Sequence, residues 1–202
     1  PGNFFDRQPG ETVEFPAARV TAGGPVKVPV PIPKFDGIIG NPPYLRSQNQ
    51  DDLDASYRKQ LFGAAAKAGV NAPAKTDLFA FFIYHALRFM KPGSRLGFVT
   101  PTSWLTADYA ASLQQVLLGK VRVLAVITSS IESFFPQVDV NALLLVAERI
   151  EDAEEHEADT DIRFVTLKRP LATLLSNTGE YWDRVIKLVD HIEAIAVSEE
   201  TA

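Results

Sequence analysis

The sequence predicts an α/β protein in which helices cover the faces of a layered β-sheet. Short apolar runs typical of buried strands alternate with helical segments along the chain. The predicted loops between these elements are short, as in layered α/β domains. Of the 202 residues, 46% are hydrophobic and 22% are charged, close to the average of globular domains, which argues against a disordered or fibrous chain.

Residues 1–34 are expected to be an irregular, proline-rich N-terminal segment. Prolines alternate with apolar residues over residues 25–33, a spacing that excludes a helix and favours an extended arm. Residues 35–40 are a short apolar run that ends on glycine, which is typical of a buried parallel strand. Residues 41–44, Asn-Pro-Pro-Tyr, end this strand and cannot begin a helix.

Residues 51–150 are expected to supply the helices and the other strands of the sheet. A polar amphipathic helix is predicted over residues 51–68, with acidic residues at its start, where the helix dipole favours them. Thr76 and Asp77 precede a second helix, which runs to about Met90 and is apolar on nearly every face, so we expect it to be buried. The other expected elements are strands over residues 95–100, 121–128 and 141–148, and a helix over residues 106–118 that Gly119 ends.

Residues 151–202 form the third predicted segment. Acidic residues dominate positions 151–161, which is typical of a solvated loop. A further strand is expected over residues 162–167. Helical spacing of apolar residues predicts a C-terminal helix over residues 181–197.

Composition excludes several kinds of site. The chain has no cysteine, which rules out disulfides, thiolate metal sites and a cysteine nucleophile. His85, His156 and His191 lack metal-ligand spacing, so we expect no metal site. No apolar run is long enough to span a bilayer, and we expect a cytoplasmic protein without a membrane partner. The net charge of −5 means that any phosphate contacts must be local or lie on another part of the protein.

The motif Asn41-Pro42-Pro43-Tyr44 carries the predicted chemistry. Two prolines stiffen the loop, so the Asn41 side-chain oxygen and the Pro42 carbonyl can accept the two N–H groups of one amino or carboxamide nitrogen. Tyr44 adds a flat face on which a planar group can stack. The motif follows a predicted strand, as does the loop at residues 101–104, and ligands bind at the carboxyl ends of such strands. The alternative interpretation is a proline-stiffened turn with a buried tyrosine.

The segment Phe35-Asp-Gly-Ile-Ile-Gly-Asn-Pro-Pro-Tyr44 resembles the catalytic segment of amino-methyltransferases that use S-adenosylmethionine. Together with the pieces that follow it in order, it is similar to the gamma-class adenine-specific DNA methyltransferases, in particular the large restriction–modification and phage-defence methylases. The resemblance covers about residues 35–149. The later pieces are Asp77-Leu-Phe-Ala-Phe-Phe82, residues 87–93, Gly97-Phe-Val-Thr-Pro-Thr-Ser-Trp-Leu105, Phe134-Phe-Pro-Gln137 and Asn141-Ala-Leu-Leu-Leu-Val146.

This resemblance implies a partial doubly wound, Rossmann-like methyltransferase sheet with helices on both faces, in which residues 35–150 are the C-terminal half of the catalytic domain. It implies that the loop containing Asn41, Pro42 and Pro43 holds the amino group of an adenine flipped out of double-stranded DNA. Tyr44 would stack on that adenine. Phe135 matches the position that packs on the other face of the base, and its neighbour Phe134 competes for the same role.

The resemblance also implies S-adenosylmethionine as cofactor. Gly2-Asn3-Phe4-Phe5 is similar to the Asp-Phe pair that contacts the cofactor's adenine, although Asn3 stands where aspartate is usual, so Asn3 and Phe4 are the candidate cofactor residues. The family's glycine-containing cofactor loop and target-recognition region would lie outside residues 1–202. We therefore expect a piece of a longer protein that by itself neither transfers methyl groups nor binds the cofactor tightly. Other restriction or defence subunits are possible partners of the whole protein.

Two alternatives stay open. Glutamine methylases that act on translation factors and some ribosomal-RNA guanine methylases share Asn-Pro-Pro-Tyr, because their acceptor chemistry is the same. The polar insert at residues 45–75 and the Phe-Pro loop at Phe135 fit the DNA-modifying branch better. The second alternative is a catalytically silent, methylase-like scaffold.

Overall fold

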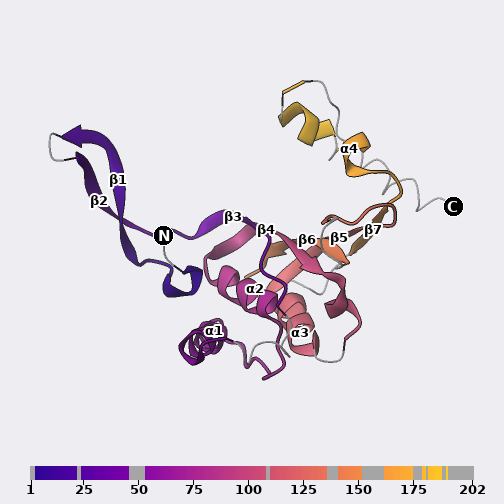
Figure 1. Ribbon diagram of the computed structural model, residues 1–202, viewed down its shortest axis with the longest axis horizontal. Helices are drawn as coiled ribbons and strands as arrows, with labels where there is room; N and C mark the ends of the chain where they lie inside the picture. The colour runs from indigo at the N-terminus through magenta and orange to yellow at the C-terminus, as the bar shows by residue number, and fades with distance from the viewer. Residues whose placement is uncertain are drawn as a thin grey trace.

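The structure, a computed structural model, contains a five-stranded sheet and a separate two-stranded sheet (Figure 1). It describes residues 3–21, 24–45, 53–107, 110–135, 141–151, 162–174, 179–180, 182–187 and 190. The strands are β1 (Thr12–Thr21), β2 (Gly24–Pro31), β3 (Phe35–Gly40), β4 (Met90–Pro101), β5 (Val121–Ser129), β6 (Ala142–Arg149) and β7 (Arg163–Leu167). The helices are α1 (Ala55–Lys67), α2 (Leu78–Arg88), α3 (Ala111–Lys120) and α4 (Leu171–Leu174), with 3-10 turns η1 (Phe4–Asp6) and η3 (Thr102–Leu105).

The larger sheet is mixed, with the strand order β3-β4-β6-β5-β7. β3 pairs with β4 in parallel and β5 pairs with β7 in parallel, whereas β6 runs antiparallel to both of its neighbours. The predicted α/β class is confirmed. Because of this topology, β3, β4, β5 and β7 all end at one edge of the sheet, and β6 begins there.

The helices α1, α2 and α3 lie on one side of the sheet in Figure 1. The side chains of β4 that face them, Leu96 and Phe98, are buried, and the paired residues of β6 are buried as well. On the other face, Ile39 is 88% exposed. Helices were expected on both faces of the sheet. Among the described helices, α1, α2 and α3 all cover the same face. The expected burial of the apolar second helix is confirmed, because all but two of the residues of α2 are buried.

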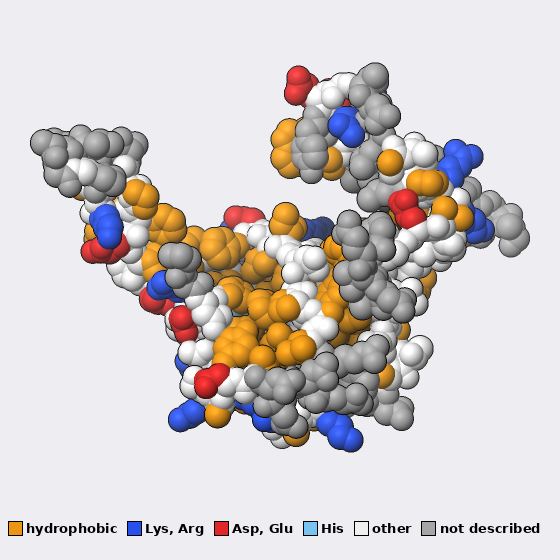
Figure 2. All heavy atoms as spheres, viewed as in Figure 1, with side chains coloured by type: hydrophobic (Ala, Val, Ile, Leu, Met, Phe, Trp, Pro, Cys, Tyr) orange, Lys and Arg blue, Asp and Glu red, His pale blue; other side chains and the backbone are white. Residues whose placement is uncertain are grey.

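The sequence suggested an irregular segment over residues 1–34, but β1 and β2 within it form an antiparallel hairpin. Both strands have a free edge, and an edge strand tolerates proline, which cannot donate a hydrogen bond. Pro29 and Pro31 accordingly lie opposite Glu14 and Thr12. The hairpin projects from the body in Figure 1. Phe15 on it is 55% exposed, and Figure 2 shows hydrophobic side chains along the hairpin near the body.

Several predicted boundaries need correction. α1 begins at Ala55 rather than residue 51, because the Asp54 carboxylate accepts hydrogen bonds from the backbone N–H groups of Ser56 and Tyr57 and so caps the helix. α2 ends at Arg88, and β4 begins at Met90 rather than residue 95, because Phe35 pairs with Met90. Gly119 lies inside α3 instead of ending it, and residues 102–105 form a 3-10 turn.

The C-terminal segment is described only in part. The strand expected over residues 162–167 is confirmed as β7, whereas α4 was not expected from the sequence. Residues 152–161, with His156, and most of the helix expected over residues 181–197, with His191, lie outside the described residues. No helix in the described part of the chain is long and apolar enough to cross a membrane.

Candidate active site

Asn41 directly follows β3 at the edge where four strands end. The residue before it, Gly40, pairs with Phe98 of β4, and a Cβ atom on Gly40 would lie 3.1 Å from Cε1 of the Phe98 ring. Phe98 is only 5% exposed, so its ring has little room to move. Glycine at position 40 therefore lets the strand end close against the core and places Asn41 at the rim.

The predicted catalytic loop is anchored at its far end as well. The carbonyl oxygen of Leu45 accepts a hydrogen bond of 3.1 Å from the backbone N–H of Leu78, the first residue of α2. Pro42 is buried, while Asn41 and Pro43 are exposed. The Asn41 amide makes no hydrogen bond to a described residue. Its oxygen is therefore available to accept N–H groups from a ligand.

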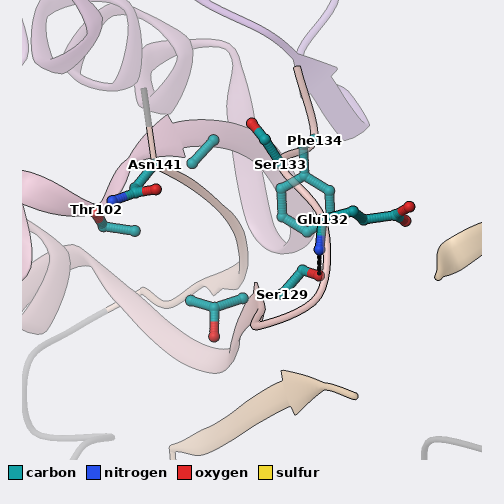
Figure 3. A pocket seen from close by; sticks show the side chains of 8 residues that line it. Thr102, Ser129, Glu132, Ser133, Phe134 and Asn141 are labelled. Atoms are coloured by element: carbon teal, nitrogen blue, oxygen red, sulfur yellow. Dashed lines mark hydrogen bonds between the residues drawn. The ribbon is translucent and has the colours of Figure 1, made fainter. Parts of the chain in front are cut away.

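The structure brings the two predicted base-stacking residues together. The rings of Tyr44 and Phe135 have centroids 6.1 Å apart and an angle of 70° between their planes. Phe134 instead lines a neighbouring pocket, to which Phe135 does not contribute (Figure 3). This placement favours Phe135 over Phe134 as the partner of Tyr44, and the role of both in binding a base stays a prediction.

Tyr44 presents a neutral hydroxyl. Its ring is half-buried, and its oxygen is buried without a hydrogen-bond partner among the described residues. Burial disfavours the charged phenolate and raises the pKa of Tyr44 to about 12. The side chain is thus suited to stacking and not to proton transfer near neutral pH.

A polar pocket of about 260 Å³ lies at the same edge of the sheet (Figure 3). Within it, Ser129 shapes the turn after β5, because its hydroxyl oxygen accepts hydrogen bonds from the backbone N–H groups of Ile131 and Glu132, at 3.3 and 3.2 Å. Thr102, from the predicted ligand loop at residues 101–104, and Phe134 were candidates from the sequence, whereas the other lining residues were not. The lining residues are Thr102, Thr128, Ser129, Glu132, Ser133, Phe134, Asn141 and Ala142.

Asn3 and Phe4, the candidate cofactor residues, lie against α1 and α2. The Asn3 oxygen accepts a hydrogen bond of 3.2 Å from the N–H of Phe5, and its amide nitrogen donates to Gln60 at 3.3 Å. The Phe4 ring packs between aromatic side chains, including Phe82 at a centroid distance of 5.9 Å. Both residues are half-buried, so each keeps an exposed part.

His85 serves the structure and not a metal. It is buried, its Nε2 lies 3.0 Å from the Phe4 carbonyl oxygen, and its Nδ1 lies 3.3 Å from Nη1 of Arg88. Burial lowers the pKa of His85 to about 4, so the ring is neutral and donates from Nε2 to the carbonyl. Arg88 also donates to the Gln8 side chain at 2.6 Å. Within the described part of the chain, no group of three or more acidic or histidine side chains is placed to hold a metal ion.

The chain is similar to known type II methyltransferases over part of its length. Type II methyltransferase M.XamI of Xanthomonas campestris pv. amaranthicola is 30% identical over 112 residues, which cover 54% of this chain and 20% of that protein. Type II methyltransferase M.TthHB8I of Thermus thermophilus is 28% identical over 111 residues, which cover 55% of this chain and 25% of that protein. The chain therefore matches a quarter or less of the length of these relatives.

A solved structure shows the same fold. The type IIG restriction endonuclease BpuSI superposes with a TM-score of 0.52 at 14% identity, over 74% of this chain and 18% of that one. A family model described as Eco57I restriction-modification methylase matches residues 14–135, which is more than half of the chain. That range contains both the loop at Asn41 and the aromatic pair of Tyr44 and Phe135. The predicted restriction–modification methylase is confirmed at this level, and the chain belongs to the Eco57I restriction-modification methylase family.

Proposed function

We propose that the protein containing this chain methylates the N6 amino group of adenine in double-stranded DNA, as part of a restriction–modification or phage-defence system. One observation carries the proposal: the exposed Asn41 stands three positions before Tyr44, whose ring meets Phe135 at the carboxyl edge of the sheet. Membership of a methylase family supports methyl transfer. The acceptors in the Asn41 loop support an amino group as the target.

Asn41 and Pro42 act on the target nitrogen in this proposal. The Asn41 amide oxygen and the Pro42 carbonyl oxygen each accept one N–H of the amino group, which draws the nitrogen toward tetrahedral geometry and frees its lone pair. With a sulfonium donor bound, this lone pair would take the methyl group, and the sulfur would keep the electron pair of the broken carbon–sulfur bond. The methylated nitrogen then releases one proton to water.

Tyr44 and Phe135 hold the base in this proposal. The amino group of adenine is paired inside the duplex, so the nucleotide must leave the stack to reach Asn41. An extruded base loses its stacking on the DNA neighbours, and two aromatic rings at the site replace part of it. The edge-to-face contact between the two rings opens when the base enters.

Bound S-adenosylmethionine supplies the electrophilic methyl group. Asn3 and Phe4 are proposed to contact its adenine, and their environment fits this role in part. The Asn3 oxygen accepts one hydrogen bond, from the N–H of Phe5, and an amide oxygen has a second lone pair that can accept another. The half-exposed Phe4 ring offers an apolar edge beside it.

Transfer of a labelled methyl group tests the proposal on the full-length protein. The protein is incubated with methyl-labelled S-adenosylmethionine and, separately, with adenine-containing duplex DNA, a glutamine-bearing translation factor and ribosomal RNA. We expect label in DNA as N6-methyladenine. Asn41→Ala should reduce the rate by about a hundredfold or more, because one of two preorganised acceptors is lost.

The control is Asn71→Ala, which changes an exposed amide outside the site and should keep the rate of the unmodified protein. Label found only in glutamine of the translation factor, or only in guanine of the ribosomal RNA, would show that this molecule, and not DNA, is the substrate. A complete absence of label from all three substrates would favour the silent scaffold and overturn the proposal.

A further inference from the structure

We propose that the carboxyl ends of β5 and β7 form a binding site for a phosphodiester of the DNA strand, next to the predicted base site. Lys168 and Arg169 supply the charge, and the polar pocket supplies uncharged donors. This inference rests on the proposed function, because it adds the backbone contact that keeps the target nucleotide in register.

The parallel pairing of β5 and β7 places the two cations beside the pocket. Ser129, which lines the pocket, is the register partner of Leu167, the last residue of β7. Ser130 strengthens this junction, because its backbone N–H donates to the Leu167 carbonyl oxygen at 3.1 Å. Lys168 and Arg169 come directly after Leu167, and both are exposed. They therefore emerge at the same edge of the sheet as Ser129.

The pocket offers donors that suit an acceptor-only ligand such as a phosphodiester. The Ser129 hydroxyl oxygen already accepts two backbone N–H groups, so its own proton is directed to another acceptor. The Thr102 hydroxyl and the Asn141 amide make no hydrogen bond to a described residue. Figure 3 shows these two side chains close together, while the carboxylate of Glu132 extends away from them.

Three basic side chains at the opposite edge of the sheet are engaged with carboxylates: Lys91 pairs with Asp36, and both Arg95 and Arg122 lie against Glu148. Lys34 and Arg163, at that same edge, form no ion pair with a described residue. At the pocket edge, neither Lys168 nor Arg169 forms an ion pair with a described residue. Lys168 and Arg169 are adjacent and have no acidic partner among the described residues, so they can supply a local phosphate contact in a chain whose net charge is −5.

The pocket adjoins the base site through consecutive residues. Phe135 meets Tyr44, and Phe134 lines the pocket. A strand whose base lies between Tyr44 and Phe135 must continue past this loop on one side. The phosphodiester bound here is accordingly a neighbour of the flipped nucleotide, and its contact carries position and no sequence information.

The salt dependence of DNA binding tests this site in the full-length protein. Kd for a specific and for an unrelated duplex is measured from 50 to 200 mM KCl. Lys168→Gln/Arg169→Gln should weaken binding to both duplexes alike and lower the slope of log K against log salt by about 2, roughly 1 for each lost phosphate contact. Thr102→Val should weaken binding with the slope unchanged, because a hydroxyl displaces no counterion.

The matched control is Lys34→Gln/Arg163→Gln, which removes two exposed cations at the opposite edge of the sheet and should keep the original slope. Neutral methylphosphonate linkages beside the target adenine provide a second test. These linkages should weaken DNA binding by the unmodified protein. They should reduce the affinity of Lys168→Gln/Arg169→Gln only slightly, because this variant has already lost the phosphate contact.

The proposed phosphate site would be wrong if Lys168→Gln/Arg169→Gln left the salt slope unchanged, or if the control variant lowered the slope by the same amount. The result is separate from the proposed function. A protein that methylates DNA in an Asn41-dependent manner but shows an unchanged slope contradicts only the phosphate site. A protein that binds no DNA contradicts both.

Discussion

The rings of Tyr44 and Phe135, which are 91 positions apart in the chain, meet edge to face with their centroids 6.1 Å apart. This edge-to-face contact is of the kind that aromatic pairs prefer. In the proposed function, a base that enters would exchange this aromatic contact for two stacked ones. Substitutions of Tyr44 and Phe135 are therefore expected to change base binding separately from the stability of the fold.

Substitutions of Tyr44 should separate its ring from its hydroxyl. Tyr44→Phe should keep methyl transfer and raise the free energy of unfolding by about 1 kcal/mol, because it removes a buried hydroxyl that lacks a partner among the described residues. Tyr44→Ala should weaken base binding by about 1–3 kcal/mol. Transfer rates and chemical denaturation of both variants check this. Equal loss of activity in Tyr44→Phe and Tyr44→Ala would show that the hydroxyl, and not the ring, acts on the substrate.

Phe135→Ala should impair methyl transfer more than Phe134→Ala. Phe135 meets Tyr44, whereas Phe134 lines the neighbouring pocket, so only Phe135 is placed to stack on the same base. The expected loss is about 1–3 kcal/mol in base binding. Fluorescence of 2-aminopurine at the target position reports extrusion of the base directly. A larger loss of extrusion in Phe134→Ala would reverse the assignment.

Gly40→Ala should displace Asn41 and destabilise the fold. The added Cβ would lie 3.1 Å from the buried Phe98 ring, so either the ring or the end of β3 must shift. Overpacking of this kind costs about 1–3 kcal/mol, and the transfer rate should fall with it. Gly63→Ala in α1 is the matched control, because nothing lies within 4 Å of a Cβ there and alanine favours a helix. A Gly40→Ala protein with normal stability and rate would contradict the steric argument.

His85 should make the fold less stable in acid. Its pKa is about 4 in the folded chain and 6.5 as the ordinary value, so the unfolded chain binds the proton first as the pH falls. The contribution of His85 is complete above pH 6.5 and is lost between about pH 6.5 and pH 4, by at most about 1.4 kcal/mol per pH unit. Denaturation at several pH values measures this slope. His85→Gln can still donate to the Phe4 carbonyl, and it should flatten the dependence of stability on pH. An unchanged slope in this variant would show that another group is responsible.

The sequence by itself determined the class of the fold and indicated the centre of the proposed site, because both depend on local patterns. The apolar run at residues 35–40, the two prolines at Pro42 and Pro43 and the apolar helix that became α2 each restrict the chain within a few residues. The chemistry of Asn41 and Tyr44 follows from the acceptors and ring that these residue types carry. The hairpin of β1 and β2 was missed because alternating prolines mask strand propensity, although a two-stranded sheet has free edges that accept them.

Only the tertiary structure decided which distant residues meet. The antiparallel placement of β6 between β4 and β5 brings Asn141 beside Thr102, and the pairing of β5 with β7 brings Lys168 to the pocket edge. Strand order and direction arise from pairing across the whole sheet, and no window of sequence contains both partners. The contact of Tyr44 with Phe135, and not with Phe134, also depends on the tertiary structure, because Tyr44 lies 91 positions away in the sequence.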